Sequence, residues 1–518
     1  MGAVPRTRPG PTGTCVTVRS VRFWATVFAV ATFAGLPASV AAAVPAPAQA
    51  ATAPVSGPLR PASALGPEIV PGAPQGGYVG RLTLAPAHAP AGTPVIMRAS
   101  GLPIRQPFDL VWTTMEGRWK AADGEYKGRE YRPVAYRIAS VTSDARGEVE
   151  ASFVVPEDFG FSHDVLLQQG ARLFTKAGFD VDMTVAISPA QGPPGTPITV
   201  DVKGIGWRHM ENSWLLLYDN RFTGWMSAVT TPGSARFTIP AAGAPGVHVL
   251  EVLHGDFTFP YRNMQQSPVP DRPQFVREFT VTEGAPVLPP PVEQQALAQP
   301  RLPAAHGTLV TTPAFSVVGE PLRIEGRGLT PGKTYDVTWQ TVSGNRVGGG
   351  GWQAQTRPLG KARADAAGTL GLALATPDDL GGAHVIGIDD GATVRSGVHW
   401  IMPSAKPLDV ARGPAGTRFR IHLKGVGWTE TANIYTVVYD NAYIGYGCGF
   451  NSQGDAEFTL YASGPPGWHF IDLYPAIYKG TEARPLNFRI PQLTYAQDHP
   501  GEDLPAFRFA FEVVEDAQ

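Results

Sequence analysis

The sequence is poor in cysteine, in charged residues and in stretches free of helix breakers. Only 2 of its 518 residues are cysteine, so a scaffold stapled by several disulfides is excluded. Charged residues make up 17% of the chain, and the formal net charge is -2 with no run of basic residues. Recognition of nucleic acid, or of an anionic membrane surface, is therefore not expected. With 59 glycines and 51 prolines, the chain is interrupted too often for long helices.

The sequence also lacks the short motifs that carry catalysis or metal binding. There is no Gly-x-Ser-x-Gly, no His-Glu-x-x-His and no paired-carboxylate arrangement. The densest group of acids and histidine, Asp498, His499, Glu502 and Asp503, matches no metal-ligand spacing and is predicted to be a solvated loop. We expect no catalytic residue, no metal, no cofactor and no enzymatic activity.

The first fifty residues have the pattern of a secretory signal peptide. Arginines precede an apolar run over 23–44, and Ala48-Gln49-Ala50 is a small-residue cleavage pattern. A membrane anchor is the alternative, but Gly35 and Pro37 interrupt the run. We predict a signal peptide over residues 1–50, no membrane insertion after cleavage, and a secreted protein that is extracellular, at the cell surface or periplasmic. The Pro- and Ala-rich residues 51–78 are predicted to be disordered.

Cleavage at that point leaves Cys448 as the only cysteine of the chain. A single thiol cannot form an internal disulfide, so packing must supply the stability. We expect Cys448 to be a small buried residue in a strand over 443–450. An intermolecular disulfide or a reactive thiol is the alternative.

The chain contains an internal duplication. Residues 195–248 recur as residues 416–469 at a constant spacing, so that Tyr218-Asp219-Asn220 matches Tyr439-Asp440-Asn441. The segments before them match in the same way, with a longer loop in the first copy between about 117 and 143. This predicts two pairs of domains: 79–182 and 183–284, then 306–403 and 404–518. Residues 285–305, which are rich in proline, are predicted to be a stiff extended linker.

Within each unit, short alternating runs are separated by turn residues, which favours an antiparallel sandwich of two sheets. The fold predicted is all-β, with four tandem immunoglobulin-like sandwiches arranged as two duplicated pairs. The chain resembles the immunoglobulin-like repeats of bacterial exported proteins, including the IPT/TIG-like group. The resemblance rests on Pro194-Gly195-Thr196, Gly204-Ile205-Gly206-Trp207 and Pro245-Gly246-Val247-His248. It implies fold more than function, because such modules serve as spacers, adhesins and enzyme appendages.

Several residues recur at the same place in the units and are interpreted as structural. His163, His248, His384 and His469 are predicted to bond a neighbouring loop or cap a sheet edge, because a catalytic base needs a partner specific to one site. Asp-Asn after Tyr218 and after Tyr439 is predicted to be a hairpin turn, with a calcium site as the alternative. Trp207 and Trp428 are expected to be buried against the facing sheet.

The longer loop of the first unit is the candidate binding site. It interleaves aromatic and basic residues, of which Trp119, Tyr126, Arg129 and Tyr131 are the predicted ligand-binding set. Exposed aromatics beside hydrogen-bond donors are how a β-sandwich grips a sugar or a protein partner. The alternative is that 131–138 is a further strand with its aromatics in the core.

These observations predict a non-enzymatic exported protein that serves as a structural or adhesion module of the cell envelope or the extracellular space. Its expected partner is an envelope protein or a polysaccharide. The alternative is a carbohydrate-binding accessory protein that uses the aromatic and basic loop of the first unit.

Overall fold

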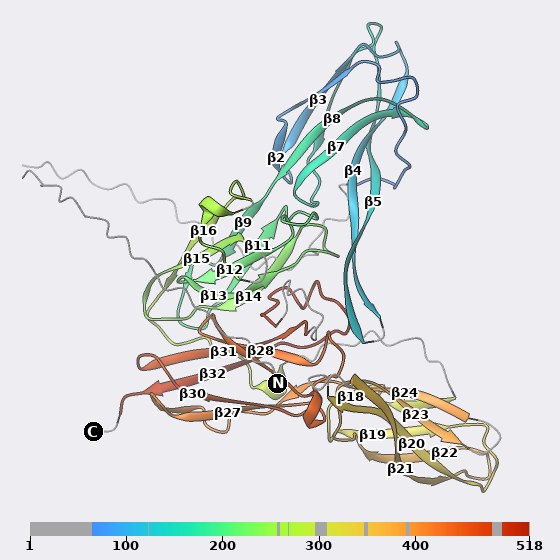
Figure 1. Ribbon diagram of the computed structural model, residues 1–518, viewed down its shortest axis with the longest axis vertical. Helices are drawn as coiled ribbons and strands as arrows, with labels where there is room; N and C mark the ends of the chain where they lie inside the picture. The colour runs from blue at the N-terminus through green and yellow to red at the C-terminus, as the bar shows by residue number, and fades with distance from the viewer. Residues whose placement is uncertain are drawn as a thin grey trace, which may run out of the picture. The chain divides into compact units, whose positions relative to one another are not determined.

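The computed structural model describes residues 65–122, 124–255, 259–267, 269–295, 308–345, 351–389, 394–478 and 489–516. This part of the chain consists of β-strands and three short 3₁₀ helices, without an α-helix (Figure 1). The strands form four three-stranded and four five-stranded sheets. The predicted all-β fold of four tandem sandwiches is confirmed. The predicted signal peptide, and residues 51–64 after it, lie outside the described residues.

Domain 1 packs the sheet β1-β3-β6 against the sheet β2-β8-β7-β4-β5. Its strands are β1 (Arg81–Ala85), β2 (His88–Pro90), β3 (Pro94–Ser100), β4 (Pro107–Ala122), β5 (Glu125–Thr142), β6 (Val149–Val154), β7 (Phe161–Gln169) and β8 (Arg172–Asp182).

Domain 2 pairs the sheet β14-β11-β9 with the sheet β10-β16-β15-β12-β13. Its elements are β9 (Thr184–Ser188), β10 (Gln191–Gly192), β11 (Pro197–Lys203), β12 (Trp214–Tyr218), β13 (Arg221–Met226), β14 (Ala235–Pro240), β15 (Gly246–His254), η1 (Met264–Gln266) and β16 (Phe275–Val281), followed by η2 (Val292–Gln294).

Domain 3 pairs the sheet β17-β19-β22 with the sheet β18-β24-β23-β20-β21. Its strands are β17 (Leu309–Thr312), β18 (Phe315–Ser316), β19 (Pro321–Gly326), β20 (Thr334–Asn345), β21 (Gly351–Arg363), β22 (Leu370–Ala375), β23 (Gly382–Asp389) and β24 (Val394–Ile401).

Domain 4 pairs the sheet β25-β27-β30 with the sheet β26-β32-β31-β28-β29. Its elements are β25 (Ser404–Ala405), β26 (Arg412–Pro414), β27 (Arg418–Lys424), β28 (Ile434–Tyr439), β29 (Ala442–Cys448), η3 (Phe450–Ser452), β30 (Ala456–Tyr461), β31 (Gly467–Ala476) and β32 (Phe507–Val514).

The four domains share one strand order. The sheets are antiparallel, as predicted, except that the second short strand of each domain runs parallel to the last, as in β2 with β8 and β26 with β32. The same parallel pair joins β10 to β16 and β18 to β24. The duplication read from the sequence is therefore visible in the strand order as well.

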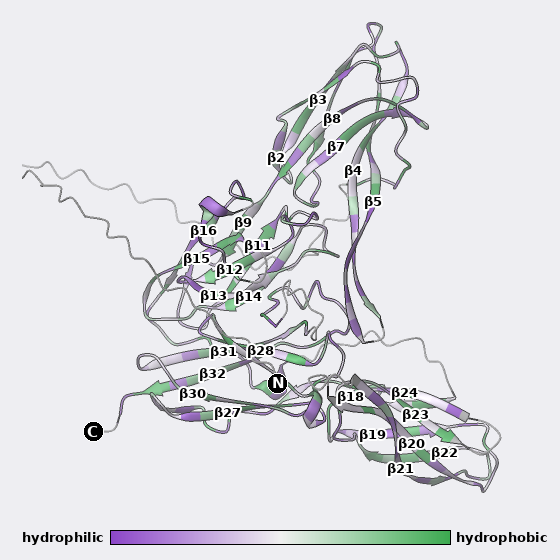
Figure 2. Ribbon diagram, in the orientation of Figure 1, coloured by the Kyte–Doolittle hydropathy of each residue, from purple (hydrophilic) through white to green (hydrophobic). Residues whose placement is uncertain are grey.

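Alternation of side chains gives each domain its own core. Along β3 and β11 every second residue is buried, because successive side chains of a strand point to opposite faces. Figure 2 shows hydrophobic and hydrophilic residues mixed along single strands. Each core is centred on large buried rings, among them Trp112, Trp214, Trp339 and Phe419. Burying one such side chain contributes about 1.5–3 kcal/mol.

The prediction of disorder for residues 51–78 is wrong for the described part, residues 65–78. Ile69 N donates to Ala135 O at 2.9 Å, and Leu173 N donates to Ala73 O at 3.0 Å. The side chain of Leu65 packs against the core of domain 1. The composition of this segment suggested disorder. In the structure its backbone bonds the strands of domain 1, and a few of its apolar side chains pack against that domain.

The described part of the predicted linker, residues 285–295, is not a free spacer but contacts two domains. Residues 285–295 lie against domains 2 and 4: Val287 N donates to Pro194 O at 2.8 Å, and Val292 is 8% exposed within the core of domain 4. Gln295 exchanges two hydrogen bonds with the backbone of Arg508. This stretch is docked, because it carries an apolar side chain and an amide that domain 4 can accommodate. Residues 296–305 of the predicted linker lie outside the described part.

Candidate interaction site

The predicted loop of domain 1 is a hairpin of two long strands. β4 and β5 pair from Pro107 opposite Thr142 to Ala122 opposite Glu125. β4 pairs with β7 only over residues 109–112, so the outer half of the hairpin runs on beyond that sheet (Figure 1). A strand over 131–138, the alternative prediction, is confirmed. Its aromatic residues, however, do not belong to the core of domain 1, and Tyr131 contacts Trp207 of domain 2 with ring centroids 5.9 Å apart.

All four predicted ligand-binding residues are engaged within the chain. Trp119 Nε1 donates to the Asp498 carboxylate at 2.8 Å. Tyr126 is 8% exposed and belongs to an apolar cluster with domain 2 and domain 4 side chains. Arg129 places its guanidinium 5.2 Å above the ring of Trp119. Tyr131 meets Phe159 edge to face at 5.8 Å.

This arrangement does not form an exposed aromatic platform. The rings of Trp119 and Tyr126 are inclined at 51°, not coplanar. The backbone nitrogen of Tyr126 donates to the Glu430 carboxylate at 2.9 Å, and Glu430 N donates to Gly124 O at 2.7 Å. The tip of the hairpin is therefore bound to domain 4, and the aromatic residues form an interdomain contact.

Asp498 is the centre of this contact. It is 1% exposed, and its carboxylate accepts hydrogen bonds from Trp119 Nε1 at 2.8 Å, Val229 N at 2.8 Å, and Thr230 N and Oγ1 at 2.9 and 2.7 Å. Its backbone oxygen accepts from Gln492 Nε2 at 2.7 Å. One side chain thus joins the hairpin of domain 1, domain 2 and residues 489–506 of domain 4. A buried carboxylate needs this number of donors to offset its desolvation.

The prediction of a solvated loop around Asp498 is wrong. Besides Asp498 itself, Glu502 accepts hydrogen bonds from the hydroxyls of Thr429 and Thr431. His499 Nε2 lies 2.8 Å from Asp503 Oδ1. The acids of this loop are used to dock it, and no signal in the sequence distinguishes such a loop from a solvated one.

Residues 491–493 add a strand to the edge of domain 2. Trp225 N donates to Pro491 O, and Leu493 N donates to Trp225 O, both at 2.9 Å. The two segments run parallel at Trp225 and Gln492. Gly224 makes room for the added strand, because a Cβ there would lie 2.6 Å from Pro491 O. Domain 4 therefore covers the edge of β13 with its own backbone.

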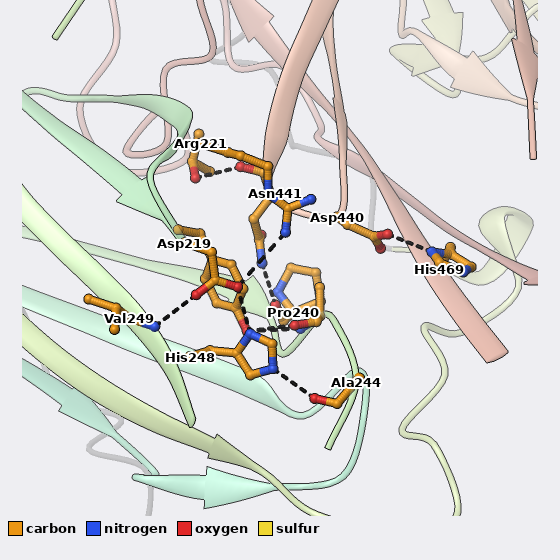
Figure 3. Close-up of polar contacts among 12 residues, drawn as sticks. Asp219, Arg221, Pro240, Ala244, His248, Val249, Asp440, Asn441 and His469 are labelled. Carbon is orange, nitrogen blue, oxygen red and sulfur yellow. Dashed lines mark hydrogen bonds and ion pairs between the residues drawn. The ribbon is translucent and has the colours of Figure 1, made fainter. Parts of the chain in front are cut away.

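The two Tyr-Asp-Asn turns meet where domain 2 faces domain 4 (Figure 3). Asp219 and Asp440 have φ of 49° and 46°, as the predicted hairpin turn requires. Asn441 Nδ2 donates to Pro240 O at 2.8 Å, and Thr223 Oγ1 donates to Asn441 O at 2.6 Å. The asparagine side chain is thus used for an interdomain bond.

Each turn is held by the histidine that recurs in the sequence. His248 Nδ1 lies 2.6 Å from Asp219 Oδ2, and His469 Nδ1 lies 2.5 Å from Asp440 Oδ2, as Figure 3 shows. Burial by itself lowers the pKa of His469, but the hydrogen bond and charge of Asp440 outweigh burial and raise it above 6.5. The other ring nitrogen of His469 lies 2.9 Å from Pro465 O.

In domains 1 and 3 the equivalent histidine has different neighbours. His384 lies between the carbonyl oxygens of Gln340 and Leu380, at 2.9 and 2.7 Å, and its ring stacks on Trp339 at 4.4 Å. Burial lowers the pKa of His384, although both carbonyl bonds oppose this effect. The predicted bond to a neighbouring loop is confirmed, since in each domain the ring ties a strand to the loop before it.

The prediction of buried positions for Trp207 and Trp428 is wrong, because both side chains are only half-buried. In the shared Gly-x-Gly-Trp turn the residue between the glycines enters the core, with Ile205 at 1% and Val426 at 0% exposure. Trp428 instead meets Trp352 edge to face at 4.9 Å. A turn before a strand directs its two apolar side chains to opposite sides, and only one can enter the core.

The predicted burial of Cys448 is also wrong, because its side chain is exposed. It lies on the same face of β29 as the exposed Ile444 and Tyr446. A strand with alternating exposure is also compatible with the sequence pattern, since hydrophobic residues alone do not show which face is covered.

A cleft of ≈ 1010 Å³ lies between the outer face of the sheet β14-β11-β9 and domain 4. Arg508 borders it and donates to Thr238 O and Oγ1 at 2.8 and 2.9 Å. Asp472, 3.6 Å from the Arg508 Nε, is buried, which raises its pKa to about 6 although Arg508 opposes the shift. These charged groups are therefore engaged with one another.

The described residues contain no group of three or more histidine, cysteine, aspartate or glutamate side chains arranged to hold a metal ion. In the same part of the chain no helix is long and apolar enough to cross a membrane.

No protein-family model and no curated protein sequence matches the chain. Among solved structures it is similar to an alpha-2-macroglobulin from Salmonella reacted with methylamine, with a TM-score of 0.18, 9% identity, and coverage of 84% of this chain and 31% of that one. A membrane-anchored protein from Corynebacterium diphtheriae gives a TM-score of 0.16 and 9% identity, covering 62% and 89%. An S-layer protein gives 0.11 and 12%, covering 86% and 55%. The chain thus spans about a third of the alpha-2-macroglobulin length, and likenesses this low carry no conclusion about function.

Proposed function

We propose that the chain is a non-enzymatic exported protein that acts as a structural and protein-interaction module at the cell envelope or outside the cell. The observation that carries the proposal is the way in which the domains are joined. Domains 1, 2 and 4 share side chains and backbone bonds through Asp498, the hairpin β4–β5 and residues 491–493. A chain built this way presents its surfaces in fixed register, as an interaction scaffold requires.

Two further points support this proposal. The basic and apolar pattern of residues 1–50 fits an export signal, and the sequence resembles the IPT/TIG-like repeats of exported proteins. The repeated histidines and aspartates make bonds that fix turns and loops in all four domains. Both ring nitrogens of each of these histidines lie within hydrogen-bond distance of a protein oxygen, which supports a structural role for them.

The observations do not favour the alternative of a carbohydrate-binding role for the hairpin. Trp119, Tyr126, Arg129 and Tyr131 are engaged in contacts within the chain. A sugar would have to displace these contacts before it could stack on the rings.

Location is tested on cells that carry the full chain with a C-terminal epitope. Protease added to intact cells should remove the epitope, or the epitope should be found in the medium, while a cytoplasmic control protein stays intact. An epitope that is protected until the cells are lysed would contradict export.

Partner class is tested with the purified full chain on a solid support and envelope extract. We expect saturable capture that is abolished when the extract is treated with protease and unchanged when it is treated with periodate. Loss on periodate treatment alone would favour a polysaccharide partner and refute the protein-interaction role.

A further inference from the structure

The duplication allows a comparison between two equivalent strand edges. β12 pairs with β13 and β28 pairs with β29 in the same register: Leu215 faces Trp225, and Thr436 faces Tyr446. Both hairpins carry an irregularity at the same point, one residue before the shared glycine. β13 and β29 are each the last strand of their sheet. The two edges are therefore equivalent in pairing register.

The edge of β13 is covered, whereas the described residues leave the edge of β29 open. Residues 491–493 bond the backbone of Trp225, which is 0% exposed. Within the described part of the chain, residues 444–448 make backbone bonds to β28 and to no other segment. Ile444 and Tyr446 are 52% and 45% exposed.

The glycine that the two strands share, Gly224 in β13 and Gly445 in β29, also distinguishes the covered edge from the open one. A Cβ on Gly224 would meet Pro491 and Leu493 within 3 Å. On Gly445, which has φ of 151°, no described atom lies within 4 Å of that position. At the matching position of domain 4 the described residues therefore leave open the space that Pro491 and Leu493 fill beside β13.

The direction of the free backbone groups follows from the register. Trp225 directs both its N–H and its C=O away from β12, because both bond residues 491–493. In an antiparallel pair the residue at the matching position points the same way. The N–H and C=O of Tyr446 are thus directed to the open edge. The side chain of Arg489 lies 5.9 Å over the Tyr446 ring, which is a contact with the ring face and not with these backbone groups.

We propose that the edge of β29 over residues 444–448 is a docking site for an extended peptide segment of a partner protein. The segment adds as a strand beside Tyr446, in the parallel direction seen for residues 491–493 on β13. The peptide needs the features that residues 491–493 present to β13. The residue opposite Tyr446 must be preceded by a free C=O and followed by a free N–H, and an apolar side chain such as leucine must lie over Gly445. The inference rests on the protein-interaction role proposed above and gives it a surface.

The experiment uses the full chain and a fluorescein-labelled peptide with the sequence of residues 489–495, Arg-Ile-Pro-Gln-Leu-Thr-Tyr. Fluorescence anisotropy should show saturable binding with one site per chain. The same peptide with Leu493→Pro lacks the N–H that bonds the edge, and should bind at least about tenfold more weakly.

Two variants of the protein test the location. Tyr446→Pro removes the outward N–H, at an edge position where proline does not interrupt the ladder to β28, and should weaken binding at least about tenfold. Ile444→Lys places a charge on the same edge and should weaken it as well, without a change to the backbone. Tyr461→Ala, an exposed tyrosine on β30, is the matched control and should leave affinity within about twofold.

Several results would overturn the inference. Absence of peptide binding at millimolar concentration, or binding unaffected by both edge variants, would show that this edge is not the site. Binding only after deletion of residues 479–488 would assign the edge to the chain's own segment. A dimer of the wild-type chain that Tyr446→Pro dissociates would assign it to a second copy. If the peptide does not bind but the chain still captures an envelope protein, the edge is wrong and the proposed function stands; if neither binds, both fail.

Discussion

Removal of the Asp498 carboxylate should loosen the contact among domains 1, 2 and 4 without unfolding domain 3. In Asp498→Ala, three N–H donors lose their acceptor: Trp119 Nε1, Val229 N and Thr230 N. A buried donor left without a partner costs about 1–3 kcal/mol, and water can enter to satisfy part of the group. We therefore expect a loss of about 3–6 kcal/mol in the free energy of local opening.

Native-state hydrogen exchange followed by mass spectrometry measures this free energy segment by segment. Amides over 225–230 and over the outer half of the hairpin should exchange at least about a hundredfold faster, while the amides of β20 in domain 3 keep their rate. Asp516→Asn, at an exposed carboxylate, is the control and should change no segment by more than about 0.5 kcal/mol. Unchanged protection at 225–230 in a folded Asp498→Ala protein would refute the central role of this side chain.

Two further predictions concern pH: domain 3 should lose stability as pH falls, and domain 4 should lose stability as pH rises. Domain 3 should lose stability as pH falls below 6.5, because burial lowers the pKa of His384 and lowers that of His399 to about 4, so that the unfolded state binds protons more readily. The His399 shift alone is worth ~2 kcal/mol at pH 5. A free energy of opening of β23, obtained from hydrogen exchange, that is the same at pH 7 and pH 5 would argue against it. His469 has a raised pKa, so its stabilisation of domain 4 is complete below pH 6.5 and is lost as pH rises through that raised value. His469→Gln should therefore destabilise domain 4 more at pH 6 than at pH 9 in thermal unfolding, and an equal effect at both would contradict the ion pair with Asp440.

The duplicated all-β fold could be predicted because its signals are local. Alternation along a strand, turn residues at the strand ends and recurrence of Tyr-Asp-Asn are each contained in a few consecutive positions. The positive φ of Asp219 and Asp440 is a property of the turn itself, so it follows from residue type. The histidines could be interpreted as structural for a similar reason, since the same ring recurs near the start of the same strand.

The contacts between domains depend on pairs far apart in the chain. Trp119 and Asp498 are separated by 379 positions, and no periodicity links them. An aromatic and basic hairpin has the same composition whether it grips a sugar or packs on another domain, and an acidic loop has the same composition whether it is solvated or docked.

By itself, then, the sequence determined the strands, the turns and the duplication, because each arises from neighbours in the chain. Only the tertiary structure decided which surfaces are covered. It buried Asp498 under four donors, left Cys448 exposed, and covered the edge of β13 but not, among the described residues, that of β29. Burial is a property of what lies opposite a residue, and the equivalent strands β13 and β29 meet different neighbours.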